Sequence, residues 1–218
     1  MKKGILFDLD GTLWDSAEGV AVSWNQALAR MGYGPRATKE SVHAMMGKTM
    51  DVIACEFFPE EPREKAVQKM DLCLQMENEY LREHGGVLYE GLEATLKALR
   101  NHGWFLGIVS NCQEGYIEAF LESHGLGNYF DDTECFGHTQ HGKGDNIRLV
   151  TKRNGLNPVL YLGDTRGDYD AAGEAEIPFL HAAYGFGTVP EGTPKIMDIR
   201  DLPAWAEAFA LDTEGIGL

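Results

Sequence analysis

Two aspartates separated by a single residue stand directly after a short apolar run near the N-terminus. Residues 4–7 (GILF) are typical of a buried parallel strand, and the sequence DLDGT follows them at residues 8–12. Gly11 allows the chain to turn sharply at this point. Asp8 and Asp10 are therefore expected at the carboxyl end of a strand. That edge is where open α/β sheets bind ligands.

An aspartate pair in this position can divide acid–base chemistry between its members. One carboxylate can act ionised, as a nucleophile or metal ligand, while the other acts protonated, as a general acid. The alternative is a hairpin turn, because Asp-Gly is a common hairpin dipeptide. No second strand follows, however. Residues 15–18 (DSAE) instead predict a helix start, with Asp15 as the N-cap and Glu18 three residues later.

Apolar, β-rich runs alternate with helical patterns along most of the chain. The strand candidates cover residues 4–9, 104–109, 159–162 and 177–182, with a weaker one at 130–136. Helical periodicity fills the intervals and stops at glycines, which are common helix terminators. This alternation predicts an α/β fold with a Rossmann-like core, built on a doubly wound parallel sheet.

One long segment, residues 15–86, breaks this alternation. It shows helical periodicity without a strand signal, as in the stripe formed by Val20, Trp24 and Leu28. The simplest organisation is an α/β core made of residues 1–14 and 87–218, with an inserted helical cap of residues 15–86 facing the carboxyl edge of the sheet. The methionines of the cap are expected to serve as core packing.

The composition restricts the partners of the chain. Its net charge of −15 argues against nucleic acid, which attracts clustered lysines and arginines. An anionic substrate would need a local positive site, supplied by a few lysines or a bound cation. The four cysteines form no CxxC pair, which favours reduced thiols. The first apolar run is too short for a signal peptide, and no stretch reaches membrane-spanning length, so we expect a cytoplasmic protein without a membrane partner.

Polar residues also follow a later strand candidate of the predicted core, and a lysine that is a candidate phosphate contact lies further along the chain. The run at 104–109 leads into Ser110 and Asn111, a hydroxyl and an amide. A helix starting near Gln113 would point its backbone amides at the same place, which suits an anion such as phosphate. A simple loop or helix cap is the alternative. Lys143 lies between two glycines and can reach a phosphoryl group, although a surface lysine is the plainer interpretation.

A second acidic group follows the run at 159–162. Asp164 and Asp168 are four residues apart, and a turn could bring them together as ligands of a hard cation. The alternative is that they cap a helix, since acidic side chains are favourable at a helix N-terminus.

These four elements, in this order, resemble the motifs of the haloacid dehalogenase superfamily of phosphotransferases. The resemblance spans the whole chain, and the segment 15–86 is similar to the small helical cap of that family. Gly144 stands where a proline most commonly follows the motif lysine, which loosens the alignment of that lysine. The matching residues are DLDGT at 8–12, Val109–Asn111, Lys143, and Gly163-Asp164 with Asp168.

The resemblance implies a phosphoryl-transfer site. Asp8 would attack phosphorus and form an aspartyl-phosphate, while Asp10 would protonate the leaving oxygen and then activate water. Mg²⁺ is the implied cofactor, and Asp164 and Asp168 would join Asp8 and the backbone carbonyl of Asp10 as its ligands, with Asp168 binding directly or through water. The implied phosphate-binding residues are Ser110, Asn111 and Lys143.

A phosphatase of a small phosphorylated metabolite is the favoured function. Asp10 supports it, because an oxygen leaving group needs a proton and a halide does not. A phosphomutase similar to β-phosphoglucomutase is the first alternative, and a non-catalytic regulatory protein on the same fold is the second. Lys48 in the cap and Arg166 beside the fourth motif are candidate substrate contacts. Both a monomer and a homodimer stay open.

Overall fold

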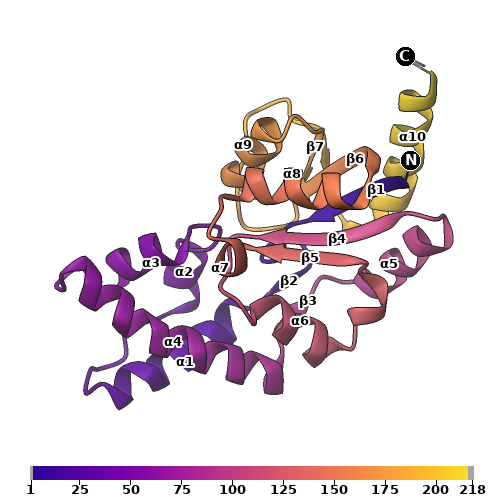
Figure 1. Cartoon of the computed structure of the whole chain (residues 1–218). Helices are drawn as coiled ribbons and strands as arrows, with labels where there is room; N and C mark the ends of the chain where they lie inside the picture. Colours follow the sequence, from indigo (N-terminus) through magenta and orange to yellow (C-terminus); the bar gives the residue numbers. More distant parts are fainter. Residues whose placement is uncertain (1, 216–218) are drawn as a thin grey trace.

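A computed structural model describes residues 2–215 of the chain, and side-chain surroundings over residues 2–211. Its centre is the predicted parallel sheet, with six strands in the order β5-β4-β1-β6-β7-β8 (Figure 1). Each hydrogen-bonded pair in this sheet is parallel, which confirms the expected α/β class. The strands are β1 (Lys2–Phe7), β4 (Phe105–Ser110), β5 (Asp132–Cys135), β6 (Leu156–Gly163), β7 (Phe179–Ala182) and β8 (Lys195–Ile196).

Helices cover both faces of the sheet. Side chains of β1 alternate between the faces, so that Ile5 and Phe7 join one buried cluster and Leu6 joins the other. α8 and α9 pack on the face of Leu6, while α5 and α6 lie on the opposite side and α10 packs against α5 (Figure 1). The bounds are α5 (Leu92–Asn101), α6 (Tyr116–His124), α8 (Lys143–Asn154), α9 (Arg166–Glu174) and α10 (Leu202–Gly215).

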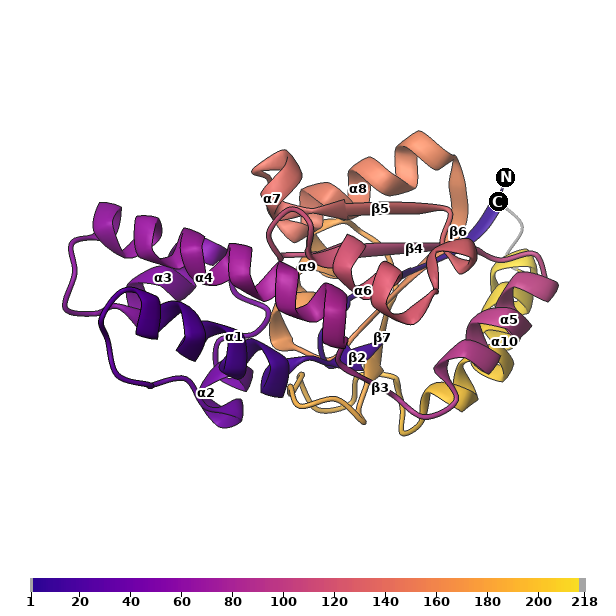
Figure 2. The same ribbon diagram turned by 90° about the horizontal axis from the view of Figure 1, so that it is seen from below.

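Four helices form a separate group beside the sheet, beyond its carboxyl edge (Figure 2). The chain enters this group through β2 (Trp14–Asp15) and leaves it through β3 (Val87–Leu88), which pair as a short antiparallel ribbon. The ribbon therefore brackets the helical segment where it joins the sheet. The four helices are α1 (Ala17–Arg30), α2 (Lys39–His43), α3 (Met50–Phe57) and α4 (Arg63–His84).

Two expected helix starts are wrong by one to three residues. The N-cap of α1 is Ser16, not Asp15, because Asp15 is already part of the ribbon. The helix expected near Gln113 begins at Tyr116, after Gly115 adopts a positive φ of 88°. Consequently Gln113 lies in a loop, and its side-chain amide donates hydrogen bonds to Glu77 and Asn78 of α4. The remaining short elements are α7 (Phe136–Thr139) and the 3₁₀ turns Gly127–Tyr129 and Ile199–Asp201.

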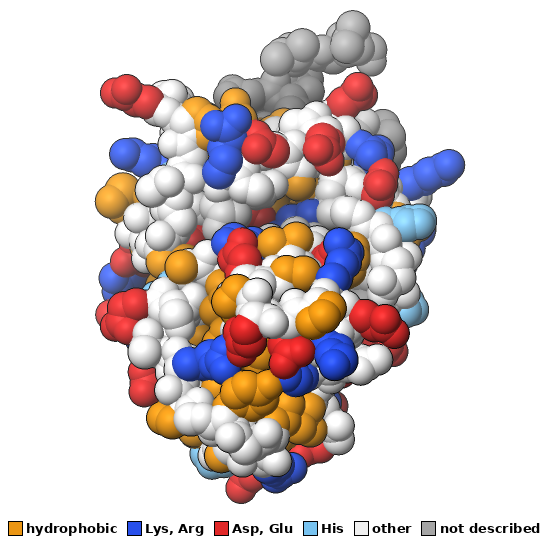
Figure 3. Space-filling model, turned by 90° about the vertical axis from the view of Figure 1, so that its left-hand side faces the viewer, with side chains coloured by type: hydrophobic (Ala, Val, Ile, Leu, Met, Phe, Trp, Pro, Cys, Tyr) orange, Lys and Arg blue, Asp and Glu red, His pale blue; other side chains and the backbone are white. Residues whose placement is uncertain are grey.

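The surface on the side of the helical group is mixed in character. Figure 3 shows acidic and basic side chains interspersed around apolar ones on this end of the molecule. Within residues 2–215, no helix combines the length and the apolar character that a membrane span requires.

Candidate active site

The two aspartates of the first motif lie where β1 ends. Asp8 directly follows the strand and is buried, and Asp10 lies within the tight turn after it. Gly11 has a φ of 78°, a conformation that favours glycine. A Cβ atom at this position would lie 2.3 Å from Oδ2 of Asp164. Glycine is therefore required both for the turn and for the close approach of Asp164.

Lys143, the first residue of α8, reaches across the sheet edge to two carboxylates. Its Nζ atom donates to Oδ1 of Asp8 at 2.8 Å and to Oδ1 of Asp168 at 2.5 Å. All three side chains are at most 3% exposed, so these ion pairs are shielded from water. Burial acts to lower the pKa of Lys143, but the charges of Asp168 and Asp8 raise that pKa above its ordinary value. Lys143 is thus a fixed cation beside Asp8.

Asp168 has two structural roles. Besides its contact with Lys143, its Oδ2 atom accepts hydrogen bonds from the backbone N–H of Thr165 at 2.9 Å and from the Thr165 hydroxyl at 2.6 Å. These bonds form part of a capping box at the start of α9. The predicted helix cap and the predicted place in the acidic cluster are therefore compatible, because each uses a different carboxylate oxygen.

Asp164 presents one free oxygen to the acidic cluster. Its Oδ2 atom accepts from the backbone N–H groups of Phe186 and Gly187, at 3.1 and 2.8 Å. Its Oδ1 atom is buried and has no hydrogen-bond partner among the described residues. Carboxylate oxygens of Asp8, Asp164 and Asp168 lie within 4.8 Å of one another. This oxygen donor set fits a hard divalent cation such as Mg²⁺.

The charge balance of the cluster leads to the same conclusion. Three carboxylates face one lysine, and burial raises the pKa of Asp8 to about 7 and that of Asp164 to about 8, with the charge of Asp168 adding to both shifts. A buried carboxylate without a compensating cation is unfavourable. The residues present therefore accommodate an additional positive ion.

Asp10 is held by two hydroxyl groups that the sequence patterns do not reveal. Its Oδ1 atom accepts from Ser16 Oγ and from Tyr116 Oη, both at 2.8 Å, and the two hydroxyls are 2.7 Å apart. Burial raises the pKa of Asp10 to about 6, against the effect of these hydrogen bonds. The arrangement fixes the carboxyl group and keeps Asp10 separate from the Lys143 cluster.

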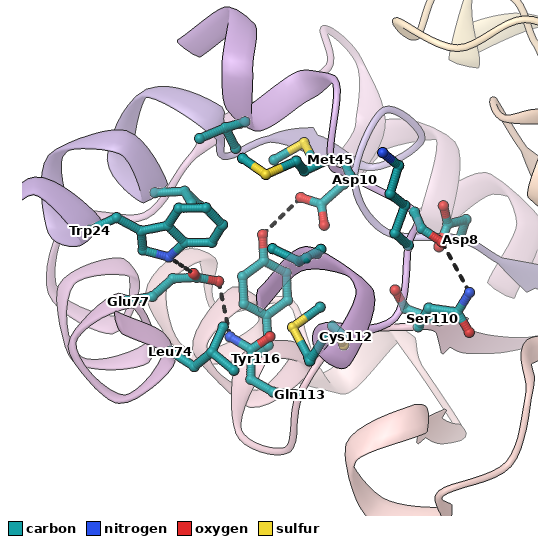
Figure 4. Close-up of a pocket in the computed structure, with 18 residues that line it drawn as sticks. Asp8, Asp10, Trp24, Met45, Leu74, Glu77, Ser110, Cys112, Gln113 and Tyr116 are labelled. Carbon is teal, nitrogen blue, oxygen red and sulfur yellow. Dashed lines mark hydrogen bonds between the residues drawn. The ribbon is translucent and has the colours of Figure 1, made fainter. Parts of the chain in front are cut away.

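A cavity lies between the sheet edge and the helical group (Figure 4). Asp8, Asp10, Ser110 and Asn111 line its sheet side. The Asn111 side-chain amide donates to the backbone carbonyl of Gly47 at 3.0 Å, so this predicted phosphate-binding residue also joins the sheet edge to the loop between α2 and α3.

The two candidate substrate contacts have different positions. Lys48 lines the cavity, although its Nζ atom forms an ion pair with Glu56 at 2.6 Å. Arg166 is on the exposed surface of α9, where it pairs with Asp170 at 2.8 Å, and it does not line the cavity. Of the two, the structure brings only Lys48 to the site.

The methionines of the helical group pack in the core as expected, but three of them also line the cavity. Met70 and Met76 are buried in the core, Met45 belongs to the same core cluster, and Met46 and Met50 pack against it. The three that line the cavity are Met45 and Met46, in the turn after α2, and Met50, at the start of α3. Helical periodicity does not distinguish a helix face that lines a cavity from one that packs in the core, because both faces are apolar.

Comparison with known proteins identifies the family. A sequence profile of haloacid dehalogenase-like hydrolases matches residues 5–182. Phosphoglycolate phosphatase of Escherichia coli is 30% identical over 208 residues, covering 84% of this chain and 82% of that protein. The chain belongs to the haloacid dehalogenase-like hydrolase family.

Solved structures share the fold of this chain. A haloacid dehalogenase-like hydrolase from Bacteroides fragilis superposes with a TM-score of 0.79 at 25% identity, covering 93% of this chain and 100% of that one. A predicted phosphoglycolate phosphatase from Haemophilus somnus has a TM-score of 0.79 at 24% identity, covering 94% and 97%. The expected class, an enzyme of the phosphatase type within this superfamily, is confirmed.

Proposed function

We propose that the protein is a Mg²⁺-dependent phosphatase that hydrolyses a small phosphorylated metabolite through an aspartyl-phosphate on Asp8. The observation that carries the proposal is the placement of Asp8 between a buried lysine and two further carboxylates, with Asp10 fixed separately on the sheet side of the cavity. A nucleophile, a cation for the phosphoryl oxygens and an independent acid are the parts that phosphate ester cleavage requires.

The proposed reaction has two steps. An Asp8 oxygen attacks phosphorus, the ester P–O bond breaks, and Asp10 gives its proton to the leaving oxygen. Asp10 then takes a proton from water as that water attacks phosphorus, and the bond between Asp8 and phosphorus breaks to release phosphate. Lys143 neutralises charge on the transferring group, and Ser110 and Asn111 would contact its oxygens.

Mg²⁺ would be held by Asp8, Asp164 and the backbone carbonyl of Asp10, and it would supply further positive charge at the phosphoryl group. Asp168 would contribute directly or through water. Its two oxygens already accept hydrogen bonds from Lys143 and Thr165, which favours contact through water.

The helical segment 15–86 is proposed to be a cap over this site, with the core made of residues 1–14 and 87–218. The ribbon of β2 and β3 at its two ends and the cavity beneath it support this division. We further propose that the enzyme is cytoplasmic and acts on metabolites without a nucleic-acid partner, in keeping with its strong net negative charge.

The proposal is tested by hydrolysis of p-nitrophenyl phosphate with and without Mg²⁺, followed by a panel of phosphorylated metabolites. We expect turnover that requires Mg²⁺ and that Asp8→Asn abolishes. Equal inactivity of the wild type and Asp8→Asn across the panel would contradict an enzymatic role. Isomerisation of a sugar phosphate that outruns its hydrolysis would indicate a phosphomutase instead.

A further inference from the structure

The part of the cavity that would receive the leaving group is mostly apolar, and its polar side chains are Lys48, Glu77, Gln113 and Tyr116. Its wall comes from the helical group and from the loop between α2 and α3 (Figure 4). The whole cavity, including its sheet side, has a volume of about 40 Å³ open to the centres of water molecules, which is room for roughly three waters. The cavity therefore suits a small leaving group. The apolar wall consists of Val20, Trp24, Val42, Met45, Met46, Met50, Ile53 and Leu74.

One carboxyl group interrupts this apolar wall. Glu77 of α4 lines the cavity and is only 3% exposed. Its Oε1 atom accepts from the Gln113 side-chain amide at 2.9 Å, and its Oε2 atom accepts from the indole N–H of Trp24. Both donors are neutral. Gln113 lies in the loop between β4 and α6, and Trp24 lies in α1 of the helical group. The Glu77 carboxyl group is therefore fixed from both sides of the cavity.

Glu77 lacks a positive partner within the described residues. No lysine, arginine or histidine there forms an ion pair with it. Burial raises its pKa to about 8, and the charge of Asp10 adds to this shift. A buried carboxylate without a cation is costly, whereas a cationic ligand would compensate it. The indole of Trp24, which also lines the cavity, is a surface that accepts an ammonium group.

The same wall disfavours an anionic leaving group. Among the described residues that line the cavity, Lys48 is the one basic residue, and Glu56 already neutralises it. A carboxylate in the cavity would be placed against apolar side chains and the carboxyl group of Glu77. The E. coli relative is named for phosphoglycolate, whose leaving group carries a carboxylate. The apolar wall and the Glu77 carboxyl group therefore disfavour such a leaving group in this chain.

We propose that this cavity selects phosphate monoesters whose leaving alcohol carries an ammonium group, with Glu77 as the specificity-determining residue. The inference rests on the proposed phosphatase function and deepens it by naming the substrate class. The phosphoryl group would lie at Asp8, and the ammonium group would pair with the Glu77 carboxylate between Trp24 and Gln113.

Three esters of matched size test this inference. Phosphoethanolamine, 2-hydroxyethyl phosphate and 2-phosphoglycolate end in an ammonium, a hydroxyl and a carboxylate group, respectively. With Mg²⁺ present, we expect kcat/KM of the wild type to fall in that order, with phosphoethanolamine above phosphoglycolate by roughly a hundredfold. Glu77→Gln should remove the advantage of phosphoethanolamine over 2-hydroxyethyl phosphate. Glu79→Gln, an exposed change on the same helix, should preserve the order.

A binding assay separates this inference from the proposed function. Calorimetry with Asp8→Asn measures affinity for the same three esters without turnover. If affinity follows the expected order while neither these esters nor p-nitrophenyl phosphate is hydrolysed by the wild type, the inference stands and the phosphatase proposal fails. A preference for phosphoglycolate in either assay, or a loss of all three activities by the same factor in Glu77→Gln, overturns the inference.

Discussion

The ammonium group of Lys143 lies 2.8 Å from Oδ1 of Asp8, although 135 residues separate them in the sequence. The contact is buried, and it forms because α8 begins at Lys143, beside the carboxyl ends of β1 and β6. It places a fixed positive charge next to the proposed nucleophile, where charge on a transferring phosphoryl group would develop.

Removal of this lysine should damage both stability and catalysis. Lys143→Ala leaves Asp8 and Asp168 buried without their cation, which costs about 3–5 kcal/mol of unfolding free energy in EDTA. We also expect kcat to fall by about 10²–10³-fold. Urea unfolding and steady-state kinetics measure the two effects. Lys152→Ala, at an exposed position of the same helix, should change neither, and an unaltered kcat in Lys143→Ala would contradict the assigned role.

Mg²⁺ should stabilise the folded protein through Asp164. Because the ion binds only the assembled site, saturating Mg²⁺ should raise Tm by about 5 °C or more relative to EDTA. Asp164→Asn should lose this increase, since Oδ1 of Asp164 is the oxygen without a partner. Asp170→Asn removes a carboxylate that pairs with Arg166 on the surface, and it should keep the full increase. Equal increases in both variants would exclude Asp164 as a ligand.

The hydroxyls of Tyr116 and Ser16 should position Asp10 for proton transfer. We expect Tyr116→Phe and Ser16→Ala each to lower kcat for an alkyl phosphate by about tenfold. The double variant should lose less than the product of the two, because the hydroxyls contact each other. The effect on kcat/KM, which reports the attack by Asp8, should be smaller for p-nitrophenyl phosphate, because its leaving group needs no proton. Tyr129→Phe, whose hydroxyl bonds Glu93 instead, is the control.

Glu77 should make stability depend on pH in one direction. Burial raises its pKa from 4.5 to about 8, so between these values it is ionised in the unfolded chain and protonated in the fold. Protonated Glu77 contributes to the stability of the folded protein. This contribution is fully present below pH 4.5 and is lost as pH rises through 8.

Glu77→Gln cannot ionise, so the variant should gain on the wild type as pH increases. The unfolding free energy of Glu77→Gln relative to that of the wild type should increase by at least about 1 kcal/mol between pH 5 and pH 8 in EDTA. Urea unfolding at the two pH values measures it. The unfolding free energy of Glu79→Gln relative to the wild type should not change between the two pH values. If that of Glu77→Gln did not change either, Glu77 would ionise normally in the folded protein.

The sheet edge that carries the candidate site could be predicted from the sequence because of the geometry of parallel sheets. Asp8, Ser110 and Asp164 each follow an apolar run, and the carboxyl ends of parallel strands share one edge. The starts of the helices could be predicted less exactly from the sequence. The backbone of Asp15 is taken up by a two-residue ribbon, whose pairing depends on a segment more than 70 residues away. Two residues are too few to show the period of a strand.

The cavity wall could not be predicted for a different reason. Glu77 is one of many acidic residues on a helix rich in charge, and its sequence neighbours do not distinguish it. It becomes a site residue because α4 packs against α1 and α6, which brings Trp24 and the Gln113 loop to its carboxyl group. Contacts of this kind arise from tertiary packing and leave no local pattern.

Asp8 carries the phosphoryl group in the proposed reaction, and the Asp10→Asn variant tests this role most directly. With p-nitrophenyl phosphate and Mg²⁺, attack by Asp8 should proceed without an acid, whereas release by water should be slow without the base. Intact-protein mass spectrometry should then show a gain of one phosphoryl group, located by peptide analysis on Asp8 and absent from the double variant Asp8→Asn/Asp10→Asn. Turnover by Asp10→Asn with no phosphorylated protein at any time, or a phosphoryl group on another residue, would contradict the role of Asp8 as the nucleophile.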